Sequence, residues 1–522
     1  MLVVVPTAGI GSRLFQRTKL INKTMLLLGN KPVISHILEA YPKNTKFLIG
    51  LGHKGDQIQE FIKLVYPKKK ISFVNIKNYK GPGSSLTHTL KILSKKIKSE
   101  FIFHANDSVV SFPKRINTKY DNIFISKKKI KINNLYRAVQ IKNNYFIKKL
   151  LDKNFGFEYA YTGISFIKDY KRFKKIINIS KKKSGEFQYF QDIFNEKKIL
   201  FQKVKNWHDI GNEQNYIEAC KLFEKKIYLK KYDESIFFHN QKVIKFFVDK
   251  NKVRERYERS KYLKNIVPDV INRGNYFYDY KFINGKILSE TLINRNELCS
   301  LLNWCSKSLF KKIELSNLEN SLFKKDCKKF YFNKTINRIS IFRKKTKIND
   351  KIYLINNIKV PKFSQLIKKI HWQEIFQGYP AKFHGDFHFE NIIKISKGYK
   401  LIDWREKFSK NYLYGDLYYD LAKLNHSFIV NHKKIVQKKF KINKIGNNVT
   451  IFIEKRLDLI ITQKFFYKFL KKNNLNIYVV NILTSLIFLN ISPLHHSPYR
   501  EFLYFLGLDC LKKTIDNHEI IL

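Results

Sequence analysis

The chain has 522 residues, which is too many for a single hydrophobic core and predicts two or more domains. Hydrophobic residues make up 44% of the sequence and aromatic residues 15%, so the composition supports buried cores and excludes a largely disordered protein. The formal net charge of +59 comes largely from lysines in short runs spread along the chain. Such runs are typical of solvated faces. A charge of this size is also compatible with an anionic partner, such as nucleic acid or a membrane surface.

The apolar runs, the first residues and the cysteines indicate in which cellular compartment the protein is expected. No apolar run reaches the roughly 18 residues that span a bilayer, and the first residues lack the basic start and cleavage site of a signal peptide. The five cysteines are odd in number and never spaced as CxxC, which indicates neither a disulfide framework nor a zinc site. We therefore expect a cytoplasmic protein with reduced thiols and no membrane span.

The first domain is expected over residues 1–224, where short apolar runs alternate with amphipathic stretches. The alternation predicts βαβ units and a Rossmann-like, mainly parallel sheet in an α/β fold. The predicted strands are LVVVP (2–6), KFLIGLG (46–52), ISFVNI (71–76), FIFHAND (101–107) and YTGISFI (161–167), and the predicted helices include VISHILEAY (33–41) and QIQEFIKLVY (57–66).

A charged segment at 225–234 contains neither glycine nor proline and is expected to link two domains. Two strands around an Asn240-Gln241 turn follow it, and then a helical stretch and a further strand. From residue 291 onward the periodicity is mainly helical, apart from a loop-rich segment at 383–414. The layout predicts a second, bilobal protein-kinase-like (α+β) domain over 235–522, with a small lobe at 235–290 and a helical large lobe at 291–522.

A glycine-containing turn follows the first predicted strand. Gly9 and Gly11 allow backbone N–H groups to approach a phosphate, and the start of the next helix favours negative charge. The turn alone also fits an ordinary tight turn, because Leu14 stands where GxGxxG would have its third glycine.

The continuation of this turn is more specific. GxGxRL at 9–14, a lysine at 23 and a G-x-K-P turn at 29–32 together resemble the sugar-phosphate and phosphocholine-type nucleotidyltransferase family. The resemblance implies that Arg13 and Lys23 bind the triphosphate, Arg13 in bidentate fashion and Lys23 at the leaving pyrophosphate. The chain departs from the family at Asn22, where proline is usual.

Two carboxylates lie where this resemblance expects metal ligands. Asp107 ends the strand FIFHAND, and Asp209 lies in NWHDIGNEQNY, which resembles the family's W-x-D-I-G-T segment. The resemblance implies that both hold Mg²⁺ at the α-phosphate, although Asp107 also fits a turn or a helix cap. Gly83 and Ser85 lie in GPGSSL, which resembles the loop that contacts the nucleotide base and also fits an ordinary turn.

The strongest motif of the chain is HGDFHFENI at 384–392, followed by LIDW at 401–404. Both closely resemble the HGDxHxxN and IDW motifs of aminoglycoside phosphotransferases and choline kinases. In eukaryotic-like kinases the aspartate orients or accepts the proton of the attacking hydroxyl, which here is Asp386. Asn391 and Asp403 would hold Mg²⁺ on the ATP phosphates.

Supporting residues lie on both sides of this motif. Lys245, in the middle of a predicted strand, resembles the kinase lysine that reaches the α- and β-phosphates. Glu258 or Glu255 on the next helix would pair with it, and the sequence does not choose between them. Asp420, in a D-x-x-x-D-L-A segment, is expected to tie the catalytic loop by hydrogen bonds.

Together the motifs predict a bifunctional enzyme that uses Mg²⁺, ATP and a second nucleoside triphosphate, CTP or UTP. Its kinase domain would phosphorylate a small alcohol, amino alcohol or sugar, and its nucleotidyltransferase domain would convert the product to an activated donor for cell-surface polysaccharide or lipid head groups. Three alternatives stay open: one domain is regulatory, the chain is an antibiotic-modifying phosphotransferase, or it is a basic nucleic-acid-binding protein. The dispersed lysines and the absence of a nucleic-acid-binding motif disfavour the last.

Overall fold

The structure is a computed structural model that describes residues 1–113, 115–127, 136–141, 146–151, 159–180, 184–223 and 233–517. Contacts between residues divide the chain into two compact units. Unit 1 comprises Met1–Lys250 and Asn272–Asp279, and unit 2 comprises Asn251–Ile271 and Tyr280–Leu522.

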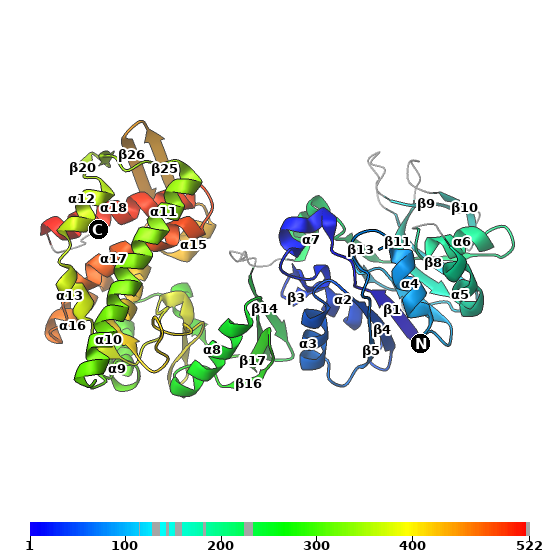
Figure 1. The fold of residues 1–522 in the computed structure, drawn as a ribbon, viewed down its shortest axis with the longest axis horizontal. Coiled ribbons are helices and arrows are strands. Elements are labelled where there is room, and N and C mark those ends of the chain that lie inside the picture. The colour runs from blue at the N-terminus through cyan, green and yellow to red at the C-terminus, as the bar shows by residue number, and fades with distance from the viewer. Residues whose placement is uncertain are drawn as a thin grey trace. The chain divides into compact units, whose positions relative to one another are not determined.

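A nine-stranded sheet flanked by helices forms the centre of unit 1 (Figure 1). Its strands are β1 (Leu2–Pro6), β4 (Lys46–Leu51), β5 (Lys70–Asn75), β6 (Phe101–His104), β8 (Asn122–Lys127), β9 (Ala138–Ile141), β10 (Ile147–Leu151), β11 (Tyr159–Ile167) and β12 (Leu200–Lys203). Two short pairs lie beside it, β2 (Leu27–Leu28) with β3 (Lys31–Pro32) and β7 (Ser108–Ser111) with β13 (Asn206–Asp209). The helices are α1 (Phe15–Thr18), α2 (Val33–Glu39), α3 (Gly55–Val65), α4 (Leu86–Ser94), α5 (Tyr170–Ile179), α6 (Phe187–Ile193) and α7 (Glu213–Phe223).

The sheet is mixed, which corrects the prediction of a mainly parallel one. Its path runs β10-β9-β11-β6-β1-β4-β5, and β8 pairs with β11 and β12. The strands β6, β1, β4 and β5 are parallel, whereas β11 is antiparallel to β6, β8 and β9. Parallel neighbours need a long crossover, usually a helix, and the described residues between β6 and β11 contain no α-helix.

Both faces of the sheet are buried. Val3 and Val5 of β1 belong to one hydrophobic cluster and Val4 to another, because successive side chains of a strand point to opposite faces. Residues of α2, α3 and α7 complete the first cluster, and residues of α4, α5 and α6 complete the second. The near-continuous apolar strands seen in the sequence reflect this double burial.

A second sheet follows, with the strand order β14-β15-β17-β16. Its strands are β14 (Glu234–His239), β15 (Lys242–Phe247), β16 (Val270–Arg273) and β17 (Phe277–Lys281). As predicted, β14 and β15 form a hairpin around Asn240-Gln241, whose positive φ values of 45° and 60° are typical of a type I′ turn.

This second sheet packs on α3. The ring centroids of Phe61 and Phe237 lie 5.5 Å apart, and the Glu60 carboxylate accepts a hydrogen bond from the backbone N–H of Tyr276 at 2.7 Å. The contacts therefore group most of the sheet with unit 1, whereas the predicted second domain begins at residue 235. The predicted linker lies outside the described residues except for its last two positions.

Unit 2 is mainly helical. Its helices are α8 (Lys250–Tyr262), α9 (Arg295–Ser308), α10 (Asn317–Lys328), α11 (Lys334–Thr346), α12 (Phe363–Leu366), α13 (Trp372–Gln377), α14 (Leu417–Ile429), α15 (His432–Val436), α16 (Leu457–Lys472), α17 (Ile477–Ile491) and α18 (Tyr499–Asn517). Its short strands are β18 (Lys286–Ile287), β21 (Pro380–Ala381), β22 (Ile392–Ile395), β23 (Gly398–Leu401) and β24 (Gly415–Asp416).

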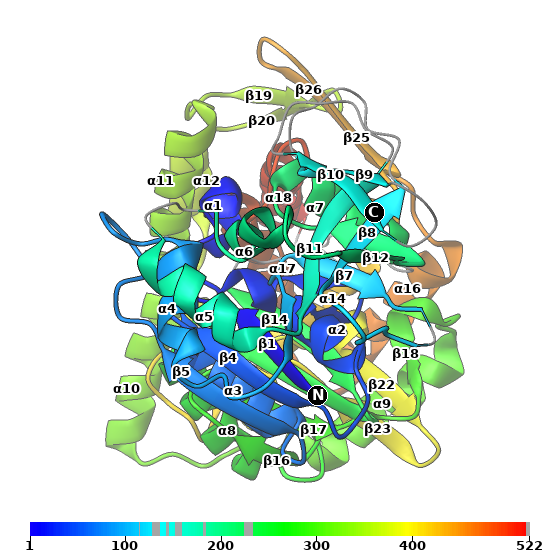
Figure 2. The same cartoon turned by 90° about the vertical axis from the view of Figure 1, so that its right-hand side faces the viewer.

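The predicted helical region also contains a sheet that the sequence analysis did not predict. The hairpins β19 (Tyr353–Ile355) with β20 (Ile358–Val360) and β25 (Phe440–Ile445) with β26 (Asn448–Ile453) join side by side into one four-stranded sheet (Figure 2). The joint is a parallel pairing of β19 with β26. A strand pairing between segments so far apart in sequence leaves no local signal beyond each hairpin.

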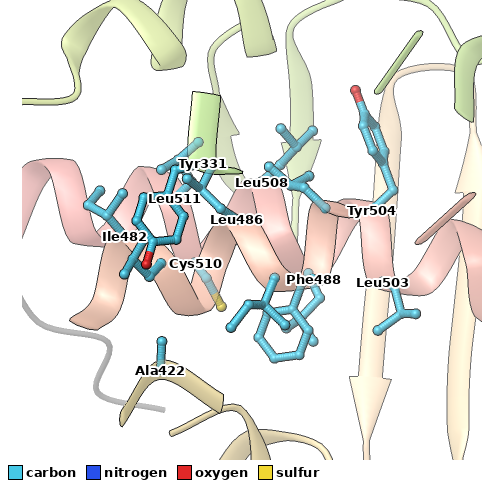
Figure 3. Close-up of a cluster of buried hydrophobic side chains, with 14 of the residues drawn as sticks. Tyr331, Ala422, Ile482, Leu486, Phe488, Leu503, Tyr504, Leu508, Cys510 and Leu511 are labelled. Atoms are coloured by element: carbon cyan, nitrogen blue, oxygen red, sulfur yellow. The ribbon is translucent and has the colours of Figure 1, made fainter. Parts of the chain in front are cut away.

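The core of unit 2 lies around α17 and α18. Figure 3 shows side chains from both helices, including Ile482, Phe488 and Leu508, gathered in one cluster. The stretch Ile477–Leu494 is apolar and long enough to cross a membrane, contrary to the expectation from sequence, but 78% of it is buried inside the protein. Helices that are apolar all round are typical of large cores as well as membranes, so the burial identifies α17 as a core helix.

Candidate active sites

The loop after β1 places the first of the predicted phosphate-binding residues. Gly11 has a φ of +67°, and a Cβ there would lie 3.0 Å from Thr18 Cγ2, so the fold itself requires glycine at this position. A Cβ at Gly9 would meet nothing within 4 Å. Packing therefore does not explain Gly9, whereas the close approach of a phosphate would.

Lys23 is held in place by the residue before it. The buried Asn22 side chain donates hydrogen bonds to the backbone oxygens of Thr7 at 3.0 Å and His53 at 2.6 Å. It also accepts from the Thr24 N–H at 2.9 Å and thereby caps the 3₁₀ helix Lys23–Met25. Proline, which is usual at this position in the family that the motif resembles, could make none of these side-chain hydrogen bonds, so Asn22 positions Lys23 in a different way.

The four charged residues predicted for unit 1 meet at one place. The Lys23 Nζ lies 2.7 Å from Asp107 Oδ2. A Cβ on Gly211 would lie 2.9 Å from Asp209 Oδ1, 3.4 Å from Arg13 Nη2 and 3.4 Å from Asp107 Oδ2. The two aspartates and Arg13 therefore lie beside Gly211, and Lys23 joins them through its ion pair with Asp107.

The pairing of β7 with β13 explains why the two aspartates come together. Asp209 is opposite Ser108 in this antiparallel pair, and the Ile210 N–H donates to the Asp107 backbone oxygen at 2.9 Å. Burial opposes ionisation of Asp107, but Lys23 and Arg13 outweigh burial and lower the pKa of its carboxyl below the usual value. Asp107 is therefore a carboxylate at neutral pH.

Two residues that the sequence analysis did not single out orient Asp209. Its Oδ2 accepts hydrogen bonds from Tyr136 Oη at 2.9 Å and from Asn215 Nδ2 at 2.5 Å, and its Oδ1 accepts the Gly211 N–H at 2.7 Å. Burial, followed by the Asp209 charge, raises the pKa of Tyr136, so the phenol keeps its proton and donates it. Asn215 follows Asp209 closely in sequence, but nothing local signals Tyr136.

The predicted base-contacting loop precedes α4. Gly83 has a φ of +81°, which favours glycine, and the Ser85 hydroxyl accepts the His88 N–H at 3.0 Å as the N-cap of α4. These roles belong to the fold, so contact of Gly83 and Ser85 with a nucleotide base remains a prediction.

A buried carboxyl outside the predicted set lies at the start of α6. Glu186 is 2% exposed, and its Oε1 accepts a hydrogen bond from Tyr161 Oη at 3.0 Å, while no hydrogen-bond donor reaches its Oε2 within the described residues. Burial raises the pKa of Glu186 to about 7, although the Arg137 guanidinium, 3.9 Å away, opposes the shift and Asp107 adds to it.

Glu186→Gln should remove a pH dependence of stability. Between the usual pKa of 4.5 and the folded value of about 7, the folded protein keeps a proton that the unfolded chain releases. The free energy of unfolding should therefore fall with rising pH across this window by about 3 kcal/mol and stay level above it. Urea unfolding at pH 5 and pH 8 tests this, and an equal fall in wild type and Glu186→Gln would contradict it.

In unit 2 the loop at 384–391 brings together Asp386 and Asn391, two of the predicted kinase residues. Asn391 Nδ2 donates to the Asp386 backbone oxygen at 2.9 Å and to Asp386 Oδ2 at 3.2 Å. The Ile402 N–H donates to the Asn391 backbone oxygen at 2.9 Å, which places Asp403 beside the asparagine. Asp403 has a φ of +59°, and such left-handed non-glycine residues are concentrated at functional sites.

Asp420 fixes this loop, as the sequence predicted. Its carboxylate accepts the backbone N–H of His384 at 2.5 Å and of Gly385 at 2.7 Å. Arg259 of α8 lies buried beneath the loop, with Nη2 donating to the Phe383 backbone oxygen at 2.5 Å and Nη1 donating to the Tyr412 oxygen. The backbone next to Asp386 is therefore held from two helices.

The sequence analysis missed the residues that pair with Asp386. Lys423 Nζ lies 2.8 Å from Asp386 Oδ1, and His388 Nε2 lies 3.4 Å from Oδ2. Burial opposes the charge on Asp386, but Lys423 and His388 outweigh burial and lower the pKa well below its usual range. The signal for Lys423 in the sequence was its place three residues after Asp420, in the same helix α14.

The predicted lysine–glutamate pair is not resolved in favour of either glutamate. Lys245 lies buried in β15 of unit 1. In unit 2, Glu258 pairs with Lys261 at 2.7 Å and Glu255 pairs with Lys407 at 2.6 Å. The phosphate-binding role of Lys245 and its pairing with Glu258 therefore remain predictions.

Several solved nucleotidyltransferase structures are similar to part of the chain. CTP:phosphocholine cytidylyltransferase from Streptococcus pneumoniae matches 42% of this chain and 98% of its own at 15% identity, with a TM-score of 0.37. UDP-glucose pyrophosphorylase complexed with UDP-glucose matches 42% and 97% at 18% identity, with a TM-score of 0.37. The inositol-1-phosphate CTP transferase from T. maritima matches 44% and 97% at 12% identity, with a TM-score of 0.34. No protein-family model and no curated protein matches the chain, so we base the function on the side-chain geometry.

The residues of both sites fit Mg²⁺ bound together with a nucleotide. No group of three His, Cys, Asp or Glu side chains that could hold a metal ion occurs among the described residues. Magnesium is usually held by one or two protein oxygens together with substrate phosphates and waters. Asp107 with Asp209, and Asn391 with Asp403, each supply a pair of oxygen-bearing side chains, as this mode requires.

Proposed function

We propose that the chain is a bifunctional transferase, with nucleotidyl transfer in unit 1 and phosphorylation of a small alcohol in unit 2. The observation that carries the proposal is the convergence of Arg13, Asp107 and Asp209 beside Gly211, with Lys23 paired to Asp107. Four residues from three distant segments, chosen from sequence motifs alone, meet at one point. Charged residues that only cover the surface of the protein would not meet at one place.

In unit 1, a phosphate oxygen of the second substrate attacks the α-phosphorus of a nucleoside triphosphate, and the bond to pyrophosphate breaks. Arg13 and Lys23 stabilise the charge that develops on the leaving pyrophosphate. Asp107 and Asp209 would hold Mg²⁺, which would supply charge neutralisation at the α-phosphate. Tyr136, through its hydrogen bond, keeps the Asp209 carboxylate oriented.

In unit 2, the hydroxyl of the acceptor attacks the γ-phosphorus of ATP, its proton passes to Asp386, and ADP leaves. The Asp386 side chain is 37% exposed, so an acceptor can reach it. Asn391 and Asp403 would hold Mg²⁺ on the phosphates, and Asp420 fixes the loop by accepting two backbone N–H groups. Positioning and charge neutralisation therefore provide most of the catalysis.

The two reactions form a sequence in this proposal. The kinase product, an alcohol phosphate, supplies the phosphate oxygen that nucleotidyl transfer needs, and CTP or UTP supplies the nucleotide. The resulting activated donor serves cell-surface polysaccharide or lipid head-group synthesis. A cytoplasmic location, where ATP is abundant, belongs to the same proposal.

The proposal is tested by incubating the full chain with ATP, Mg²⁺ and one of CTP, UTP or GTP against a panel of choline, ethanolamine, glycerol and simple sugars. Pyrophosphate release that requires both ATP and one alcohol is the expected result. ADP formation without pyrophosphate release for any nucleotide would contradict the coupling. If no alcohol stimulates ADP formation and no alcohol phosphate stimulates pyrophosphate release, both activities are wrong.

A further inference from the structure

Four cationic side chains of unit 2 gather beside the proposed catalytic aspartate. Lys334 and Arg338 lie four residues apart on α11 and therefore share one face of that helix. Lys423 comes from α14, and Arg405 comes from the segment after β23. No pattern in the sequence links these residues, because they lie on three separate segments.

Direct contacts connect this cluster to the catalytic loop. Lys423 forms the 2.8 Å ion pair with Asp386 Oδ1. Arg405 donates its backbone N–H to the His384 oxygen at 2.9 Å, and a Cβ placed on Gly385 would lie only 2.5 Å from Arg405 Cβ. The arginine therefore packs against the residue that precedes Asp386.

Aromatic rings hold two of the charged ends, those of Lys334 and Arg405, together. The Phe330 ring centroid lies 4.1 Å from Lys334 Nζ and 4.8 Å from Arg405 Cζ. Arg405 Nη1 also donates to Tyr419 Oη at 3.4 Å. Phe330 belongs to a π-helical turn, Lys329–Asn333, that joins α10 to α11, and such turns occur frequently at functional sites.

The cluster has more positive than negative charge. Among the residues that the structure describes, no carboxylate lies within ion-pair distance of Lys334, Arg338 or Arg405, and Asp386 is already paired with Lys423 and His388. Burial lowers the pKa of Lys334 well below its usual value, and Arg405, Lys423 and Arg338 lower it further. Like charges held together in a partly buried place are destabilising unless an anion joins them.

We propose that the alcohol phosphorylated in unit 2 carries an anionic group, a carboxylate or a phosphate monoester, which Lys334, Arg338 and Arg405 bind while its hydroxyl faces Asp386. The inference rests on the proposed kinase function and narrows its substrate class. It favours hydroxy acids and phosphorylated polyols over choline and ethanolamine, whose cationic groups the cluster would repel. The triphosphate of ATP is the other anion that this cluster could bind. The steady-state measurement described below distinguishes it from the acceptor.

Matched alcohols test the charge preference. The full chain is assayed for ADP formation with glycerate, glycerol 3-phosphate, glycerol and choline under identical ATP and Mg²⁺. Because a charge-assisted hydrogen bond in such a site is worth about one to two powers of ten, kcat/KM for an anionic alcohol should exceed that for glycerol by about 10- to 100-fold. Preference for glycerol or choline would overturn the inference and leave the kinase function standing.

Calorimetry gives a readout that does not depend on turnover. Glycerate and glycerol 3-phosphate are titrated into wild type, Arg338→Gln and Lys344→Gln, the last of which also replaces a cation by glutamine, at an exposed position of the same helix. Binding that weakens about 10-fold in Arg338→Gln alone supports the inference, even if none of the panel is phosphorylated and the kinase function fails. Equal binding by all three proteins, or no binding, overturns it.

Steady-state constants show whether the cationic cluster binds the acceptor or ATP. Arg338→Gln should raise KM for the anionic alcohol about 10-fold and leave KM for ATP unchanged, and Lys334→Gln, checked for folding by circular dichroism, should do the same. A rise in KM for ATP instead would show that the cluster binds the nucleotide, and the inference would be wrong.

Discussion

Asp386→Asn should lower ATP-dependent phosphorylation of the alcohol by about 10²- to 10⁴-fold, because it removes the group that accepts the proton of the attacking hydroxyl. Asparagine keeps the size of the side chain, so the loop held by Asp420 and Arg259 should stay folded. ADP formation measured with a coupled assay gives the rate, and thermal unfolding checks the fold. Nucleotidyl transfer to a presynthesised alcohol phosphate should not change.

The control for this variant is Asp516→Asn, the same substitution at an exposed position of α18. It should leave both activities at the wild-type level. Wild-type ADP formation by Asp386→Asn would remove Asp386 from the reaction and leave unit 2 without its proposed activity.

Asp107→Asn should lower pyrophosphate release by about 10²- to 10³-fold and leave ADP formation by unit 2 unchanged. The variant loses the negative charge that lies 2.7 Å from Lys23 Nζ and one of two proposed Mg²⁺ ligands. Since Lys23 and Arg13 lower the pKa of Asp107, the wild-type carboxylate is ionised throughout the neutral range. Raising the pH from 7 to 9 should therefore not restore the variant, as pyrophosphate release at each pH would show.

Asp192→Asn, an exposed aspartate of α6, is the matched control in unit 1 and should retain full activity. If Asp107→Asn also retains full activity, the convergence around Gly211 serves the fold alone. A selective loss in Asp209→Asn as well would support the paired role of the two carboxylates.

The fold could be predicted from sequence where its signals are local. The hairpin at Asn240-Gln241 follows from two apolar strands separated by two residues that tolerate positive φ. The mixed sheet of unit 1 could not be predicted in the same way, since strand direction depends on pairings such as β11 with β6 rather than on the strand's own residues. The hairpin β25–β26 had a usable signal in Gly446-Asn447 between two alternating segments, but its pairing with β19 had none.

The apolar helix α17 shows that composition alone does not distinguish a core helix from a membrane span. Its composition reaches that of a membrane span, and only its burial against α14 and α18 identifies it as a core element. Hydropathy counts the apolar residues of a segment but not the neighbours that cover them. The same limit applies to polar residues, since Tyr136 reaches the site through hydrogen bonds with Asp209 and Asn215 that no sequence pattern indicates.

The sequence by itself determined which residues carry the proposed chemistry, namely Arg13, Lys23, Asp107 and Asp209 in unit 1 and the HGDFHFENI and LIDW motifs in unit 2. In unit 2 a short motif suffices because one loop carries several of the proposed reacting groups within a few residues, whereas in unit 1 separate motifs each contributed one or two residues. Only the tertiary structure singled out the cations of unit 2 that lie beside Asp386 among the 101 lysines and arginines. Lys334, Arg338, Arg405 and Lys423 resemble any other basic residue in sequence, and what distinguishes them is partial burial beside one carboxylate, a property of packing between helices rather than of any one segment.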